Sequence, residues 1–327
     1  MDPFVVFALG LVLAAEFVNG WTDAPNSIAT VVSTRVLSPT QALFMASVLN
    51  ILGAMSGTAV AATVGKGIVR AEAVNVTTVA AAMLAIVIWS TLAWVYGLPT
   101  SESHALVAGL SGAGLAAAGT GVLIWDGWQK VLIGLVFSTF LGFGGGFLLM
   151  VAIYWVFRAW KPGAVRKVFG RVQILSAAFM AFSHGSNDGQ KFIGAFTLTL
   201  VLGGLLPKFD VPMWVILMCA VTMGIGTAVG GWRIVKTMGL KMTKLDPVHG
   251  FAAETAAASA IEVASRLGIP VSTTHTISTS IMGVGSTRRL SAVRWGVGTD
   301  IITAWVLTFP VCGLLAFGMA KLLSLVH

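Results

Sequence analysis

The sequence predicts an all-α polytopic membrane protein with two inverted-topology repeats, broken helices and paired re-entrant hairpins. Three observations lead to this fold class. The chain carries little charge, it contains a succession of long apolar stretches, and its two halves carry the same pair of polar motifs in the same order. Together they narrow both the folds and the functions that are open to the chain.

Charged residues are scarce. The 327 residues include 20 Lys+Arg and 12 Asp+Glu, which is 10% of the chain, whereas 57% are hydrophobic. Soluble domains carry about 25% charged residues, so this composition excludes an ordinary soluble enzyme and a disordered chain. The net charge of +8 is too thinly spread for the dense basic patch of a nucleic-acid binder. The predicted partner is therefore a lipid bilayer and not a nucleic acid.

Long apolar stretches follow one another with short linkers. A membrane-spanning helix needs about 20 mostly apolar residues, and most of the stretches are long enough. The first one has Asp2 in place of a basic leader, so we expect a membrane helix there and not a signal peptide. The stretches cover residues 3–33, 41–64, 74–96, 103–124, 130–157, 174–206, 211–232, 247–267, 271–287 and 295–323.

Two of these stretches contain a polar, Gly-rich cluster. One cluster covers residues 16–27 and the other covers residues 183–191. We expect them to interrupt the helix at membrane depth, where irregular backbone must be buried in protein or line a cavity. A charge at the bilayer centre costs at least about 2.5–3.5 kcal/mol, so Asp23 and Asp188 need a functional reason to be there.

The two halves repeat one another. The polar clusters align at an offset of 165, which pairs Asp23 with Asp188. At an offset of 171, Gly97–His104 aligns with Gly268–His275 in the pattern G-x-P-x-S-x-[ST]-H. A shared period of this kind indicates a duplicated unit. The predicted organisation is a first transmembrane repeat over residues 1–158, a basic cytoplasmic linker over 159–173 and a second repeat over 174–327.

The repeats are predicted to have opposite orientations. If each G-x-P-x-S element is the tip of a hairpin that enters and leaves on one side, each half makes three full crossings and the second half is inverted. Most Lys and Arg residues then fall on the side of the central linker, including Arg35, Arg166, Lys244 and Arg294, whereas Lys66, Arg70 and Lys208 are among the few on the opposite side. The positive-inside rule places this side in the cytoplasm and both termini outside, in the cell inner (plasma) membrane.

The hairpin tips have the chemistry of an oxyanion site. Pro99 and Pro270 end the preceding helix, and a new apolar helix follows each of them. The N-terminus of such a helix has free N–H groups and a partial positive charge, which favour anions. The same hydroxyls could equally be ordinary N-caps. The candidate oxyanion ligands on the tips are Ser101, Ser103, Ser272, Thr273 and Thr274.

The Asp clusters have the chemistry of a cation site. Asp23 with Asn26, and Asp188 with Asn187, offer hard oxygen ligands for Na⁺, or a carboxylate that carries H⁺, and Gln190 is a candidate for the cation or the anion. The alternative is polar contact between helices. The sequence has no nucleophile–base or metal-site motif, so we predict no enzyme, no cofactor beyond a transported Na⁺ or H⁺, and no metal beyond Na⁺ at the two Asp residues.

Four further residues are accessory candidates. His104 and His275 occupy matched tip positions and could gate access, bind the anion or lock the tip. Lys191 could pair with Asp188, attract an anion or extend along its helix. Arg266 could attract an anion or pair with a neighbouring acid. Glu16, Glu254 and Asp300 lie in apolar stretches and are candidates for ion coupling or for pairing between helices.

The motifs resemble those of the inorganic phosphate transporter (PiT) family of secondary carriers, in its compact microbial form. The resemblance covers nearly the whole chain and is carried by residues 19–30, 97–104, 184–191 and 268–275. It implies an inverted-repeat carrier, a homodimer in many members, that takes up phosphate with Na⁺ or H⁺ by alternating access. It also implies that Asp23, Asn26, Asp188 and Gln190 coordinate the ions and that the tip hydroxyls bind the oxyanion.

The sequence departs from the PiT pattern at two positions. Thr22 stands where the family often has Asn, and Glu102 stands where Ser or Thr is usual. A carboxylate beside an anion site is repulsive unless it is protonated, paired or turned away, so Glu102 indicates a role in proton coupling or gating. Sulfate is the alternative substrate, since it is also a tetrahedral oxyanion, and an anion channel is the alternative from another functional class.

Overall fold

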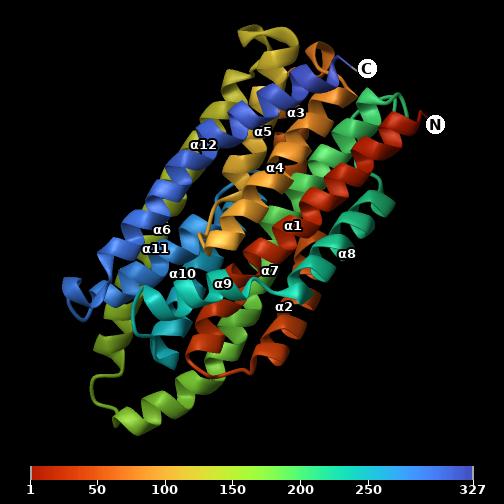
Figure 1. Ribbon diagram of the computed structural model, residues 1–327. Coiled ribbons are helices and arrows are strands. Elements are labelled where there is room, and N and C mark those ends of the chain that lie inside the picture. Colours follow the sequence, from red (N-terminus) through yellow and green to blue (C-terminus); the bar gives the residue numbers. More distant parts are fainter. Residues whose placement is uncertain (1, 326–327) are drawn as a thin grey trace.

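The computed structural model describes residues 2–325, which form twelve α-helices and no β-sheet, so the all-α prediction is confirmed (Figure 1). The first half contains α1 (Pro3–Ser33), α2 (Pro39–Ala54), α3 (Ala59–Gly67), α4 (Val76–Tyr96), α5 (Glu102–Ala118) and α6 (Trp125–Val156). The second half contains α7 (Pro162–Leu202), α8 (Met213–Val229), α9 (Trp232–Lys236), the π-helical segment η3 (Thr237–Lys241), α10 (Pro247–Arg266), α11 (Thr273–Ser286) and α12 (Trp295–Leu323).

Both halves have the same order of elements. Each consists of a long helix, a bent pair, a hairpin of two helices and a second long helix. The chain bends by 68° between α2 and α3, and by 60° between α8 and the α9–η3 segment. The helices α1, α4, α6 and α12 are long and apolar enough to cross a membrane, and the bent pairs raise this number to six. The chain is therefore an integral membrane protein.

The halves run in opposite directions. In Figure 1, α1 starts at the end that holds both chain termini, whereas α7 starts at the other end, after the α6–α7 connection. The inverted-repeat prediction is confirmed by this arrangement. Most of the predicted linker, from residue 162 onward, forms the first turns of α7. The outermost repeat limits, residues 1 and 327, lie outside the described residues.

Basic residues separate between the two ends of the molecule. Arg35, Arg166, Lys244 and Arg294 line one cavity of about 520 Å³. Three bases from the opposite set, Lys66, Arg70 and Lys208, line another cavity of about 440 Å³. The two sets are the ones that the sequence assigns to opposite faces. Which face is cytoplasmic stays a prediction.

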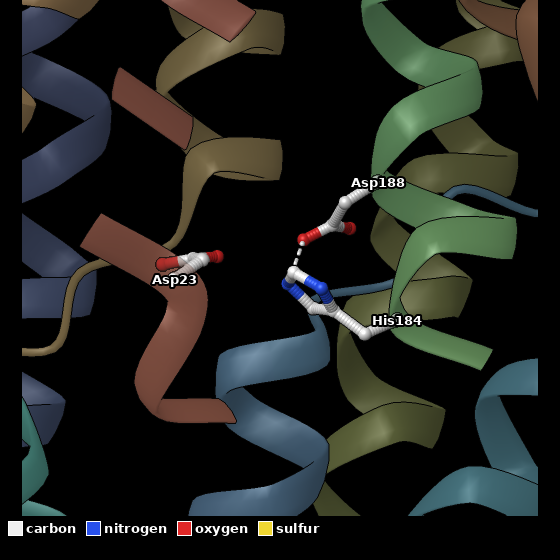
Figure 2. Close-up of side chains that lie close together, drawn as sticks. All are labelled: Asp23, His184 and Asp188. Atoms are coloured by element: carbon white, nitrogen blue, oxygen red, sulfur yellow. Dashed lines mark ion pairs between the residues drawn. The ribbon is translucent and has the colours of Figure 1, made fainter. Parts of the chain in front are cut away.

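The predicted interruption of the helices at the Asp clusters is wrong. Both α1 and α7 are continuous through them, although Pro25 lies inside α1, and their polar side chains pair with other helices. Glycines allow the close approach that this needs: a Cβ on Gly20 would collide with the Met223 backbone of α8, and one on Gly185 with the Asn50 backbone of α2. Asp23 and Asp188 therefore project from intact helices toward the same central region (Figure 2).

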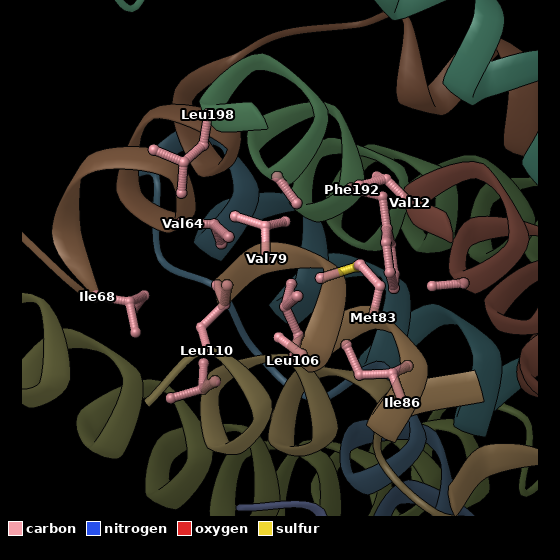
Figure 3. Packing of buried hydrophobic residues seen from close by; sticks show 14 of the residues in the cluster. Val12, Val64, Ile68, Val79, Met83, Ile86, Leu106, Leu110, Phe192 and Leu198 are labelled. Carbon is pink, nitrogen blue, oxygen red and sulfur yellow. The ribbon is translucent and has the colours of Figure 1, made fainter. Parts of the chain in front are cut away.

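Two apolar cores lie on either side of the polar clusters. On α1, the buried residues before Glu16 belong to one core and those from Ile28 onward to the other. On α7 the order is reversed, as the inversion requires. Figure 3 shows the first core, where Val12, Met83 and Phe192 of α1, α4 and α7 pack together. The polar side chains form a layer between these two cores. Because the cores on both sides are buried, the position of this polar layer along α1 and α7 is fixed.

Candidate substrate and cation site

The two hairpin tips have the same backbone geometry. Gly97 follows α4 with φ 68° and Gly268 follows α10 with φ 67°, a left-handed conformation that glycine adopts without strain. After each proline, a serine caps the new helix: Ser101 accepts a hydrogen bond from His104 N (3.3 Å) and Ser272 accepts one from His275 N (3.2 Å). The predicted helix reversal at each tip is confirmed.

The tips meet at the centre of the fold. The Ser103 hydroxyl of the first tip donates to the Val271 carbonyl of the second at 2.8 Å. The rings of His104 and His275 lie edge to face with centroids 4.5 Å apart, and His275 also stacks on Trp305 of α12 at 3.5 Å. The histidines thus hold the tips against each other and against α12. The N-termini of α5 and α11 are brought together as the sequence predicts.

Two hydroxyls at the N-terminus of α11 donate to the two buried aspartates. Thr273 Oγ1 donates to Asp188 Oδ2 at 2.8 Å, and Thr274 Oγ1 donates to Asp23 Oδ2 at 3.3 Å. Asn26 Nδ2 donates to Thr274 Oγ1 at 3.0 Å. Both carboxylates are almost fully buried. The groups predicted to bind an oxyanion and those predicted to bind a cation therefore share hydrogen bonds.

A histidine that pairs with Asp188 also lies near Asp23. Asp23, His184 and Asp188 each place one ligand atom within 4.8 Å of the others, a spacing that could hold a cation (Figure 2). His184 Nε2 lies 3.2 Å from Asp188 Oδ2, and its Nδ1 lies 3.1 Å from Asn50 Oδ1. His184 is not among the site residues that the sequence predicts. Its spacing of four residues from Asp188 was the available signal, because residues i and i+4 share a helix face.

Lys191 is buried and pairs with Asp188. Its ammonium also donates to Ser103 Oγ at 2.5 Å and to the Val271 carbonyl at 2.8 Å. An ammonium has three donors, and these three contacts use all of them. Of the alternatives predicted for Lys191, pairing with Asp188 is the one that the structure shows.

Glu102 lies at the first turn of α5 and is 1% exposed. Its Oε1 accepts a hydrogen bond from Thr22 Oγ1 of α1 at 3.1 Å. The first tip therefore places a third carboxylate in the polar layer, in addition to Asp23 and Asp188.

Comparison with known proteins agrees with this arrangement. The sequence model of the phosphate transporter family matches residues 19–316. The chain belongs to the phosphate transporter family. It is 44% identical over 316 residues to a Rhizobium meliloti (strain 1021) protein, covering 96% of this chain and 95% of the relative. A Bacillus subtilis (strain 168) protein is 40% identical over 317 residues, covering 95% of each.

Both relatives carry the name "Probable low-affinity inorganic phosphate transporter". A solved structure titled "The sodium-dependent phosphate transporter" superposes with a TM-score of 0.89 at 26% identity. The match covers 99% of this chain and 100% of that one. The similarity thus extends over the whole fold, including both hairpins.

In this member of the phosphate transporter family, three of the predicted site residues lie away from the centre of the site. Gln190 Oε1 accepts from Val60 N at 3.0 Å and so caps the start of α3. Asn187 supports the second tip, because its Oδ1 accepts from Val271 N at 3.2 Å. Arg266 has a side chain that is 68% exposed and pairs with Glu262 at the surface (2.7 Å).

The face of α1 that carries Asp23 is polar over its middle turns. Residues at i, i+3 and i+7 share one helix face, and Asp23 is the middle member of such a series. Beyond it, three polar side chains donate hydrogen bonds to the buried carboxylate of Glu254, an acid that the sequence singles out without its partners. The series on α1 is Glu16, Asn19, Asp23, Asn26 and Thr30. The partners of Glu254 are Thr30, Gln173 and Ser176.

Proposed function

We propose that this chain imports inorganic phosphate in symport with a cation, Na⁺ or H⁺, by alternating access. Membership of the phosphate transporter family supports the substrate, and the likeness to a sodium-dependent phosphate transporter supports coupling to a cation. The observation that carries the proposal is the pair of hydrogen bonds from Thr273 and Thr274 to Asp188 and Asp23.

These hydrogen bonds give coupling a physical basis. An oxyanion between the tips would lie beside carboxylates, and two like charges about 4 Å apart repel by about 4 kcal/mol at the effective dielectric of a protein. A cation bound at Asp23 removes this repulsion. By linkage, bound phosphate then raises the affinity for the cation by the same factor. The two ligands would be carried together because each favours the binding of the other.

The inverted repeats supply a route for alternating access. The tips belong to different repeats and contact each other through Ser103 and Val271. Rocking of one repeat against the other around this contact would open the site to one side at a time. We further propose that the end with Arg35 and Arg166 is cytoplasmic, that the membrane is the cell inner membrane, and that the carrier works as a homodimer.

Equilibrium binding tests the substrate. Purified protein should bind labelled phosphate, and unlabelled phosphate should displace the label at a lower concentration than sulfate does. Tighter competition by sulfate would favour the sulfate permease. Absence of binding by either anion, in protein that elutes as a single species, would contradict the proposed site.

Measurements of phosphate uptake distinguish a carrier from an anion channel. A carrier with coupling carboxylates should lose gradient-driven uptake in Asp23→Asn, because the cation loses one of its charged ligands. A channel has no need of a coupling cation. Uptake that persists unchanged without an ion gradient, in both Asp23→Asn and Asp188→Asn, would therefore indicate a channel.

A further inference from the structure

The internal repeat aligns Lys191 with a neutral residue. The offset of 165 that pairs Asp23 with Asp188 also pairs Asn26 with Lys191, and the offset of 171 pairs Ser103 with Thr274. The structure preserves this correspondence in its contacts. Asn26 donates to Thr274 of the second tip at 3.0 Å, and Lys191 donates to Ser103 of the first tip at 2.5 Å. Lys191 thus places an ammonium where the first repeat has an amide.

The ammonium of Lys191 has the surroundings of a bound cation. Its partners are a carboxylate oxygen of Asp188, a hydroxyl oxygen of Ser103 and the carbonyl oxygen of Val271. Val271 lies in the non-helical segment between α10 and α11, and carriers use such unwound carbonyls with carboxylates to coordinate Na⁺. The side chain is 1% exposed and approaches from the adjacent turn of α7.

The charges of the two repeats differ as a result. In the second repeat, Asp188 and Lys191 form a buried pair of opposite charge. In the first repeat, Asp23 and Glu102 are both buried acids, and within residues 2–325 no ion pair joins either of them to a basic side chain. Of the three carboxylates at the tips, Asp188 therefore has a positive charge supplied by the protein, whereas Asp23 and Glu102 have no basic partner among the described residues.

We propose that Lys191 is a resident cation that takes the place of an exchangeable one in the second repeat, so that, among the three carboxylates at the tips, coupling cations bind only beside Asp23 and Glu102. This inference rests on the proposed phosphate–cation symport. A tethered charge has an effective concentration that its tether sets, so Asp188 stays neutralised whatever the external cation concentration. The consequence is a carrier whose two repeats share a fold and differ in the number of cations that they require.

The test replaces Lys191 with the residue of the matched position. Phosphate binding to purified protein is measured against Na⁺ at constant pH, and against pH at constant Na⁺. In Lys191→Asn, Asp188 must take a cation from solution, so the slope of log affinity against the log concentration of Na⁺ or H⁺ should rise by about one ion. Lys191→Arg is the matched control and should keep the wild-type slope. Unchanged slopes in Lys191→Asn would overturn the inference.

A second variant covers the case in which Lys191→Asn does not fold, since an unpaired buried charge destabilises a protein strongly. Asp188→Asn combined with Lys191→Asn removes both charges and should keep the wild-type cation slope, whatever its phosphate affinity. A lower slope would mean that Asp188 holds an exchangeable cation, against the inference. Failure of the wild type to bind phosphate would instead reject the proposed function.

Discussion

Thr22 Oγ1 lies 3.1 Å from Glu102 Oε1 and shares its one proton between this carboxylate and the Val18 carbonyl at 2.8 Å, and the contact joins the two positions at which the chain departs from the PiT pattern. The residues lie on α1 and α5, 80 positions apart in the sequence. A hydrogen bond to a charged group contributes about 1.5–3 kcal/mol, more than one between neutral groups. The hydroxyl of Thr22 thus offsets part of the cost of a carboxylate in the polar layer, and we regard the two departures as one unit.

Thr22→Asn and Glu102→Thr should therefore behave non-additively. Each single variant changes one member of the pair, whereas the double variant restores the residue types that are usual in the family. We expect a coupling energy of about 1 kcal/mol or more in a double-mutant cycle of phosphate affinity. The cycle is measured by phosphate binding at one fixed Na⁺ concentration and pH. Strict additivity would show that the two departures are independent.

Hydroxyls on the second tip should differ in their effects. Thr274 contacts Asp23 and Asn26, so Thr274→Ala should weaken phosphate binding about 10-fold, which corresponds to about 1.4 kcal/mol. Ser272 caps α11, and Ser272→Ala should lower the stability by about 1 kcal/mol. Binding and thermal unfolding are measured for both variants. Arg266→Ala is the control and should change neither, because its ion pair is at the surface. Equal phosphate affinity in Thr274→Ala and wild type would reduce this hydroxyl to a structural role.

Glycine at position 185 should be essential for packing. A Cβ there would overlap the backbone of Asn50, which cannot move as the end of a flexible side chain can. Overpacking of this kind costs about 1–3 kcal/mol, so Gly185→Ala should lower the midpoint of thermal unfolding in detergent. Gly144→Ala on α6 is the matched control, since nothing lies within 4 Å of its added Cβ. If Gly185→Ala unfolds at the same temperature as Gly144→Ala, α2 and α7 can move apart without loss of stability.

Accessibility of single cysteines tests the orientation. Gly121 and Gly163 are exposed glycines with open space for a Cβ, at opposite ends of the molecule, and the native Cys219 and Cys312 are buried. In intact cells, an impermeant thiol reagent should label Gly121→Cys, whereas Gly163→Cys should react only after the membrane is permeabilised. The reverse pattern would place the α6–α7 connection outside.

The sequence predicts features that depend on local chemistry. Gly97, Pro99 and Ser101 specify the first tip without help from the rest of the fold: glycine takes the left-handed conformation, proline ends the helix and serine caps the next one. The inversion of the repeats follows from counting crossings. The tip is predicted correctly because its residues are adjacent in the chain, and the inversion because the apolar stretches of each half can be counted.

Features that depend on tertiary contacts are not predicted. The polar cluster around Asp23 predicts a helix break. The helix α1 nevertheless continues, because Gly20 packs against α8 and the polar side chains contact other helices. Gln190 lies one residue from Lys191, but its side chain points toward α3. No pattern within one repeat reveals that each tip is contacted by the long helix of the other repeat.

The central claim is that phosphate moves with a cation, and accumulation tests it most directly. Proteoliposomes with purified protein receive labelled phosphate at equal concentrations inside and outside, under an inward gradient of Na⁺ or of H⁺. We expect the internal phosphate to rise above the external concentration under at least one gradient, and to fall back when an ionophore dissipates it. Internal phosphate that never exceeds the external concentration under either gradient would contradict the account.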